Sequence, residues 1–151
     1  GTHAAAAGVS ALGARRAALL HAAVHGRVTS SGGALVLADG PLTAAEILAA
    51  GVAPRTVLLT GCATSASPDA EAWAGFPSAF LAAGSRQVVA TARSVPDAGA
   101  AELMRAYYAT PATAPAALRL AAAQRAVAAT ATVSVETWAA FAAWGDAACG
   151  P

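Results

Sequence analysis

A histidine and a cysteine each follow a short apolar run, the arrangement that a thiol nucleophile needs. Residues 20–24 form one run and precede His25, and residues 57–59 form the other, shortly before Cys62. If the two runs are neighbouring strands, the imidazole can take the proton of the thiol and leave a reactive thiolate. The pattern therefore makes the chain a candidate for cysteine-dependent cleavage of peptide bonds.

Neighbouring residues could complete this chemistry. After the thiolate of Cys62 attacks a carbonyl, the imidazolium of His25 would protonate the leaving amine. The negative oxygen that forms needs backbone donors, for which the amides of Gly26 and Cys62 are suited. Taken alone, each pattern is weak: a cysteine after a strand is usually a small buried hydrophobe, and a His-Gly pair is usually a turn.

The other histidines do not indicate a metal site. His21 shares side-chain parity with His25 along a strand, and we interpret it as a packed or hydrogen-bonded residue. His3 is expected to face solvent. No acidic residue or second cysteine joins the histidines at a ligand spacing, so no metal and no cofactor is expected. A Gly-x-Ser-x-Gly elbow and a phosphate loop are also absent from the sequence, which argues against an α/β-hydrolase and a nucleotide-binding domain.

Composition fits one globular domain. The chain has 151 residues, a net charge of +1 and an apolar fraction of 57 %, although about a third of its residues are alanines, which bury little area. All basic residues are scattered arginines, so no nucleic-acid partner is expected. No apolar stretch is long enough to span a bilayer, so no membrane partner is expected either.

The origin of the chain can also be inferred from its composition. Excess alanine and arginine without lysine is typical of a GC-rich genome. Separately, we expect a bacterial, cytoplasmic protein. Cys62 and Cys149 form no disulfide framework and are expected to be free thiols. The chain has no signal peptide and does not begin with Met, so we expect a piece of a longer protein.

Apolar runs alternate with helical patterns along the chain. We expect strands at residues 18–24, 34–38, 56–60, 87–92 and 138–144, and helices at 44–50, 77–83, 97–109 and 115–129. Residues 27–33 are interpreted as a loop or hairpin tip, and residues 39–41 as a turn. Thr43 and Glu46 form a capping box, Pro77 is expected in the first turn of its helix, and Asp97 is expected to cap the next helix.

This order predicts an α/β fold with a mostly parallel sheet and helices on both faces. On the helix that begins at Asp97, four residues are expected on the buried side: Leu103, Met104, Tyr107 and Tyr108. Chemistry in such sheets gathers beyond the carboxyl ends of the strands, where His25 and Cys62 both lie. We expect these two side chains within hydrogen-bonding reach, or one water from it.

Over nearly its whole length the chain resembles the C-terminal part of the CHAT domain, a caspase-like cysteine peptidase domain often attached to tetratricopeptide repeats. Leu20–Gly26 is similar to the His-x-x-x-His-Gly strand end of that family, and Leu58–Thr64 to its Leu-Ser-Ala-Cys-x-Thr segment. Further similar segments follow in the expected order: Ala34–Ile47, Ala79–Thr91, Glu102–Tyr108, Ala117–Ala121 and Trp138–Phe141.

The resemblance implies a caspase-like three-layer sandwich over residues 1–151, with the N-terminal strands of the domain missing from this chain. It implies that His25 is the general acid–base and Cys62 the nucleophile, with the Gly26 and Cys62 amides as the oxyanion hole. It also implies a protein or peptide substrate. Tetratricopeptide-repeat or other domains of the full-length protein are the implied partners.

Departures from the family pattern concern substrate preference. Thr60-Gly61 replaces the common Ser-Ala before the cysteine, and residues 92–96 replace a Trp-Pro-Val segment. In some caspase-type families that cut after Arg or Lys, the pocket for the substrate side chain before the cleaved bond holds an acidic residue two positions before the cysteine. The resemblance gives this position to the uncharged Thr60, which implies a pocket that disfavours basic side chains, because a buried cation without a carboxylate partner is costly. The cleft wall beyond the next strand is expected to hold three more substrate-binding residues, the first able to contact an acidic side chain: Arg93, Ser94 and Asp97.

Two functions are compatible with these patterns. One is an active cysteine endopeptidase within a larger bacterial effector or regulatory protein. The other is a non-catalytic CHAT-like module that binds a partner protein. The presence of both His25 and Cys62 favours the peptidase, since a scaffold needs neither residue.

Overall fold

A four-stranded sheet forms the centre of the chain. The computed structural model describes residues 17–29, 32–61 and 71–146. The strands lie in the order β1-β5-β6-β7, with β1, β5 and β6 parallel and β7 antiparallel at the edge. Their bounds are β1 Leu19–Ala22, β5 Thr56–Leu59, β6 Gln87–Thr91 and β7 Phe141–Gly145. The predicted mostly parallel sheet is therefore confirmed.

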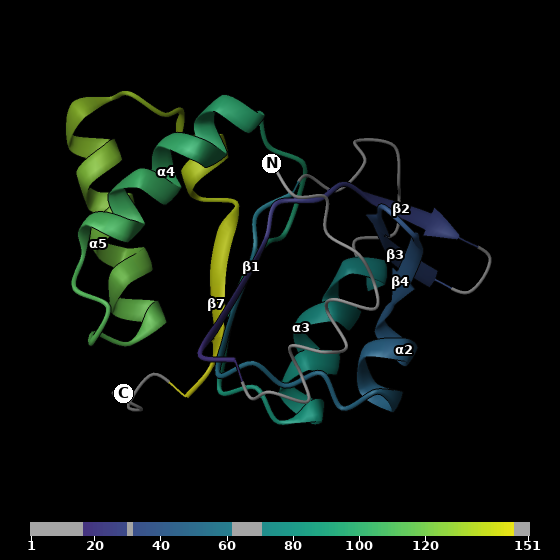
Figure 1. Cartoon of the computed structure of the whole chain (residues 1–151). Helices are drawn as coiled ribbons and strands as arrows, with labels where there is room; N and C mark the ends of the chain where they lie inside the picture. Colours follow the sequence, from purple (N-terminus) through teal and green to yellow (C-terminus); the bar gives the residue numbers. More distant parts are fainter. Residues whose placement is uncertain (1–16, 30–31, 62–70, 147–151) are drawn as a thin grey trace.

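Helices cover both faces of this sheet (Figure 1). Helices α2 (Ala44–Ala49) and α3 (Glu71–Ala83) lie on one face. Helices α4 (Asp97–Ala109) and α5 (Ala116–Thr130) lie on the other, together with the short α6 (Val135–Trp138). The three layers match the expected caspase-like α/β sandwich.

The alternation of side chains along the strands divides the core in two. In β5, Val57 and Leu59 belong to the core beneath α2 and α3, whereas Leu58 belongs to the core beneath α4 and α5. In β6, Val88 and Val89 divide in the same way. Because both faces are buried, these strands are apolar at most positions, which explains why the sequence pattern located them.

A separate antiparallel sheet was only partly predicted. It contains β2 (Gly26–Thr29), β3 (Gly32–Leu37) and β4 (Gly40–Thr43) in that order. Residues 27–33 were expected to form a loop or a hairpin tip, and β2 and β3 do form a hairpin, but the strands extend over most of that stretch. The turn expected at residues 39–41 lies at 38–39 instead. Glycine and polar residues disfavour strands intrinsically, but backbone pairing with a neighbour overrides that preference here.

Local capping rules were right for one helix and wrong for another. The capping box of α2 is confirmed: the Glu46 amide donates to Thr43 Oγ1 at 3.2 Å, and the Thr43 amide donates to the Glu46 carboxylate at 2.7 Å. By contrast, α4 has Pro96 at its N-cap without a side-chain hydrogen bond. Asp97 is the first helical residue rather than the cap, so its carboxylate is not used there.

Other boundaries also differ from the prediction. Helix α3 begins at Glu71, so Pro77 lies inside the helix rather than in its first turn. The strand predicted over residues 138–144 is shorter and later, because α6 occupies residues 135–138 and β7 begins at Phe141.

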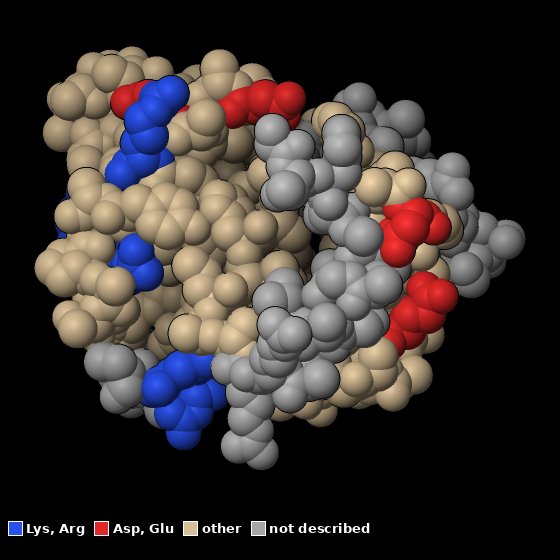
Figure 2. Space-filling view, in the orientation of Figure 1, with Lys and Arg blue, Asp and Glu red and all other residues tan. Residues whose placement is uncertain are grey.

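Charged side chains are scattered over the surface. Figure 2 shows small separate groups of arginine and acidic residues, divided by uncharged surface, with no continuous basic area on that face. Within the described residues, no helix combines the length and apolar character needed to cross a membrane.

Candidate active site

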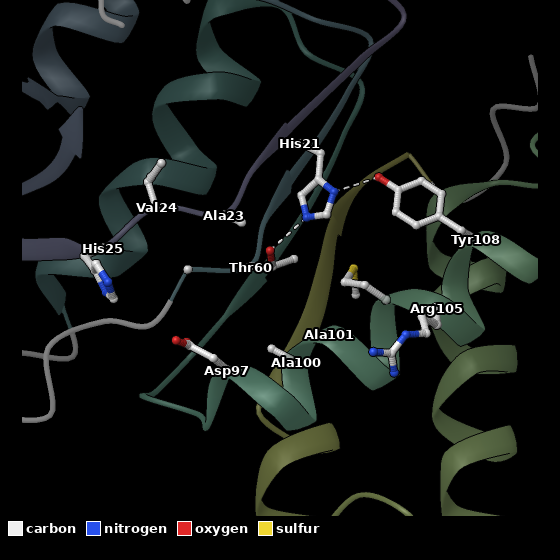
Figure 3. A pocket seen from close by; sticks show the side chains of 12 residues that line it. His21, Ala23, Val24, His25, Thr60, Asp97, Ala100, Ala101, Arg105 and Tyr108 are labelled. Atoms are coloured by element: carbon white, nitrogen blue, oxygen red, sulfur yellow. Dashed lines mark hydrogen bonds between the residues drawn. The ribbon is translucent and has the colours of Figure 1, made fainter. Parts of the chain in front are cut away.

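A cavity of about 640 Å³ opens where β1 and β5 end, opposite α4 (Figure 3). We call it the strand-end cavity. Helix α4 contributes one side of it, between Asp97 and Tyr108. The strand ends contribute the other side, with six residues: His21, Ala23, Val24, His25, Thr60 and Gly61.

The two predicted strand ends therefore open into one cavity. His25 is exposed and lines it, and so does Gly61, the residue before Cys62. Cys62 lies outside the described residues, so contact between its thiol and the His25 ring stays a prediction.

Backbone contacts hold these two strand ends together. The Thr60 amide donates to the Ala22 carbonyl at 3.1 Å, just past the last paired residues of β1 and β5. Farther on, Gly61 lies so close to Val24 that a Cβ at position 61 would overlap the Val24 carbonyl oxygen. Only glycine fits at position 61 without a backbone shift.

The direction of the Gly26 amide follows from the pairing of β2 with β3. The Val36 amide donates to the His25 carbonyl at 2.7 Å, and Gly26 stands opposite Leu35. In an antiparallel pair, residues alternate between those that bond to the partner strand and those whose N–H and C=O point away from it. The Gly26 amide therefore points away from β3, where it can serve as a donor.

His21 is held by hydrogen bonds from two sides (Figure 3). Its Nε2 lies 2.8 Å from Thr60 Oγ1, and its Nδ1 lies 2.8 Å from the Tyr108 hydroxyl. The prediction of a hydrogen-bonded histidine is confirmed. Partial burial lowers the pKa of His21 from its usual 6.5, which favours a neutral ring at pH 7.

This lowered pKa makes stability depend on pH. Below about pH 6.5 the unfolded chain protonates His21 more readily than the folded protein, so acid favours unfolding. We expect the free energy of unfolding to fall as pH drops through this range, and to fall less in His21→Gln. Denaturant titrations of both proteins from about pH 7.5 to 5 measure the difference. Equal pH dependence in the two proteins would contradict the lowered pKa.

Sequence analysis missed Tyr108 as a site residue. Tyr107 and Tyr108 were both expected on the buried side of α4, but only Tyr107 is fully buried, whereas Tyr108 is 45 % exposed. The prediction for Tyr108 is wrong, because its ring lies at the cavity, with its hydroxyl against His21, rather than in the core. The adjacent Leu103 and Met104 of α4 are both buried, so position along the helix did not by itself indicate that Tyr108 is exposed.

Two of the four predicted substrate-binding residues line the strand-end cavity. These are Thr60 and Asp97. Arg93 and Ser94 are not among the lining residues. Arg93 Nε and Nη2 instead donate to the Glu136 carbonyl at 3.2 and 2.7 Å, which connects the segment before α4 to α6. Contact of Arg93 and Ser94 with substrate stays a prediction.

The charged groups at the strand-end cavity are few. Asp97 stands at the start of α4, and Arg105, which forms an ion pair with Glu102, stands two turns later. Across the described ranges, no three His, Cys, Asp or Glu side chains come together as a metal site would require. Most of the other polar side chains among the described lining residues are therefore imidazole and hydroxyl groups, which stand beside apolar side chains such as Met104.

A sheet of mostly parallel strands, covered on both faces, with a His-Gly segment beside a second strand end, is consistent with a caspase-like α/β fold. The protein-family model of the CHAT domain matches residues 3–146, so the chain belongs to the CHAT domain family. This confirms the resemblance seen in the sequence. The family is caspase-like and related to cysteine peptidases. A search of curated proteins finds no match.

Proposed function

We propose that this CHAT domain is a cysteine endopeptidase in which His25 and Cys62 cleave a protein or peptide substrate. The observation that supports it best is the shared cavity: His25 and Gly61, the residue before Cys62, both line it. A module that only binds a partner has no need of a histidine and a cysteine at one opening.

In the proposed reaction His25 takes the proton of the Cys62 thiol, and the thiolate attacks the carbonyl carbon of the peptide bond. The imidazolium then protonates the departing amine as the C–N bond breaks, which leaves a thioester on Cys62. Water loses a proton to His25 and hydrolyses the thioester, which releases the acid and restores the thiol.

Backbone amides would stabilise the negative oxygen in both tetrahedral intermediates. The proposed donors are the amides of Gly26 and Cys62. The direction of the Gly26 amide, away from β3, supports this role because its hydrogen is not used in the β2–β3 ladder. As partners we propose tetratricopeptide-repeat or other domains of the full-length protein, in line with the family resemblance.

Labelling with a peptide electrophile tests the proposal. A peptide acyloxymethyl ketone should modify Cys62 much faster than Cys149, because only a thiol paired with an imidazole is largely thiolate at neutral pH. His25→Ala should slow labelling of Cys62 without changing that of Cys149. Mass spectrometry of tryptic peptides measures both sites. Similar rates at the two cysteines, or no effect of His25→Ala, would favour a non-catalytic binding module.

A further inference from the structure

One end of the strand-end cavity carries a chain of three polar side chains. Thr60 Oγ1, the His21 imidazole and the Tyr108 hydroxyl are linked by two contacts of 2.8 Å. The three come from the end of β5, from β1 and from α4, and all line the cavity. Apolar side chains, including Met104 of α4, form much of the remaining wall.

Counting protons shows that the hydrogen-bonded chain Thr60–His21–Tyr108 has one donor to spare. A neutral imidazole has one donor nitrogen and one acceptor nitrogen. One hydroxyl must therefore donate to His21, and the other must accept from it and keep its own proton. Within the described residues, neither the Thr60 nor the Tyr108 hydroxyl has another hydrogen-bond partner. In either tautomer, one O–H group remains available to a molecule in the cavity.

Two pKa shifts are consistent with this count. Burial lowers the pKa of His21, which favours the neutral ring. Burial raises the pKa of Tyr108, with a smaller opposing effect from Arg119, so the hydroxyl keeps its proton. The spare donor is therefore an uncharged hydroxyl.

We infer that the Thr60–His21–Tyr108 chain makes the cavity selective for an uncharged substrate side chain with a hydrogen-bond acceptor, such as the carboxamide of glutamine or asparagine. The inference rests on the proposed peptidase function. Thr60 lies two positions before Cys62 in the sequence and lines the cavity, so in the proposed peptidase we assign this cavity to the side chain before the cleaved bond. The apolar wall would pack against its methylene groups, while the spare O–H donates to its amide oxygen.

The charged residues near the cavity disfavour a positively or negatively charged substrate side chain at this end. Helix α4 follows the cavity from Asp97 to Tyr108, about 16 Å along its axis, and Figure 3 shows these residues toward opposite ends. Asp97, the carboxylate among the described lining residues, lies far from Tyr108 along α4, so a substrate cation at this end would lose hydration without a carboxylate partner. A carboxylate would lose hydration for a single hydroxyl donor, and Arg105 already pairs with Glu102.

Binding to the Cys62→Ala protein tests this selectivity without cleavage. The probes are four peptide amides, acetyl-Ala-Ala-Ala-X-aminomethylcoumarin, in which X is glutamine, glutamate, leucine or lysine. We expect the glutamine probe to bind about fivefold tighter than the leucine probe, since one neutral hydrogen bond contributes about that factor. It should also bind tighter than both charged probes. Tightest binding of a charged probe, or no difference among the four, would overturn the inference.

Substitutions that keep side-chain shape identify the residues responsible. In the Cys62→Ala background, one of Thr60→Val and Tyr108→Phe, the one that removes the spare hydroxyl, should lower the glutamine preference, because the donor left in its place is the imidazole N–H of His21, which lies at another position. The double variant keeps no donor except that N–H, so it should lose at least as much as the more affected single variant. Tyr107→Phe is the matched control, because the buried Tyr107 hydroxyl has no partner in the described part of the chain. An unchanged glutamine preference in both test variants, or an equal loss in the control, would refute the role of the Thr60–His21–Tyr108 hydrogen-bonded chain in selectivity.

Cleavage of the same four probes by the wild-type protein separates this inference from the proposed function. Cleavage without preference would refute the selectivity and leave the peptidase function standing. Absence of cleavage would refute the peptidase function, while binding to the Cys62→Ala protein would still decide the selectivity.

Discussion

Replacing Cys62 by alanine is expected to lower kcat/KM for peptide hydrolysis by about a thousandfold or more. The thiolate forms the covalent intermediate in the proposed mechanism, and alanine has no group that can do so. His25→Ala should lose nearly as much, because the thiol would then stay largely protonated and the leaving amine would lack its acid. The double variant should be no slower than Cys62→Ala, since the two residues act as a unit.

The measurement is hydrolysis of a fluorogenic peptide, with thermal unfolding to show that each variant is folded. Cys149→Ala is the matched control, because it removes the other thiol of the chain. It should retain full activity. Activity of Cys62→Ala within about tenfold of wild type would move the nucleophile elsewhere.

Gly61→Ala is expected to destabilise the protein by about 3 kcal/mol and to remove most of its activity. A Cβ at this position would overlap the Val24 carbonyl oxygen, so the two strand ends would have to move apart. This shift would move His25 away from Cys62, the proposed nucleophile that follows Gly61. A displacement of about 1 Å between reacting groups can lower a rate by about a hundredfold.

Gly75→Ala is the matched control for this substitution. Gly75 lies inside α3, and a Cβ there would meet only the Ala44 Cβ at 3.8 Å, an ordinary contact. Alanine should stabilise the helix by about 0.5–1 kcal/mol relative to glycine. Chemical denaturation of both variants compares the two effects, which should have opposite signs. If Gly61→Ala is as stable as wild type, position 61 has room for the alanine found in the Leu-Ser-Ala-Cys pattern.

Local sequence was sufficient to predict the central layers. Strands β5 and β6 were predicted because burial on both faces requires apolar residues at successive positions. The start of α2 was predicted because Thr43 and Glu46 bond within a single turn. Strands β2 and β4 were missed or assigned to turns, since their pairing depends on a partner strand rather than on their own composition.

The location of the candidate site was also predictable in part. His25 and Thr60 were placed at strand ends, and parallel strands bring their carboxyl ends to one edge. The close approach of Gly61 to Val24 was not predictable, because it depends on how two strand ends pack. Asp97 was predicted to be the N-cap of α4, but it is the first helical residue, one position later, and it lines the cavity.

By itself, then, the sequence determined which residues could do chemistry and which strands carry them. Tertiary structure alone decided what surrounds them: Tyr108 contacts His21 across 87 positions of the chain, and Arg93 contacts Glu136 rather than the cavity. Local patterns report whether a side chain is apolar and how it repeats, but not which distant group it meets. Such contacts depend on how α4 and α6 pack against the ends of the sheet.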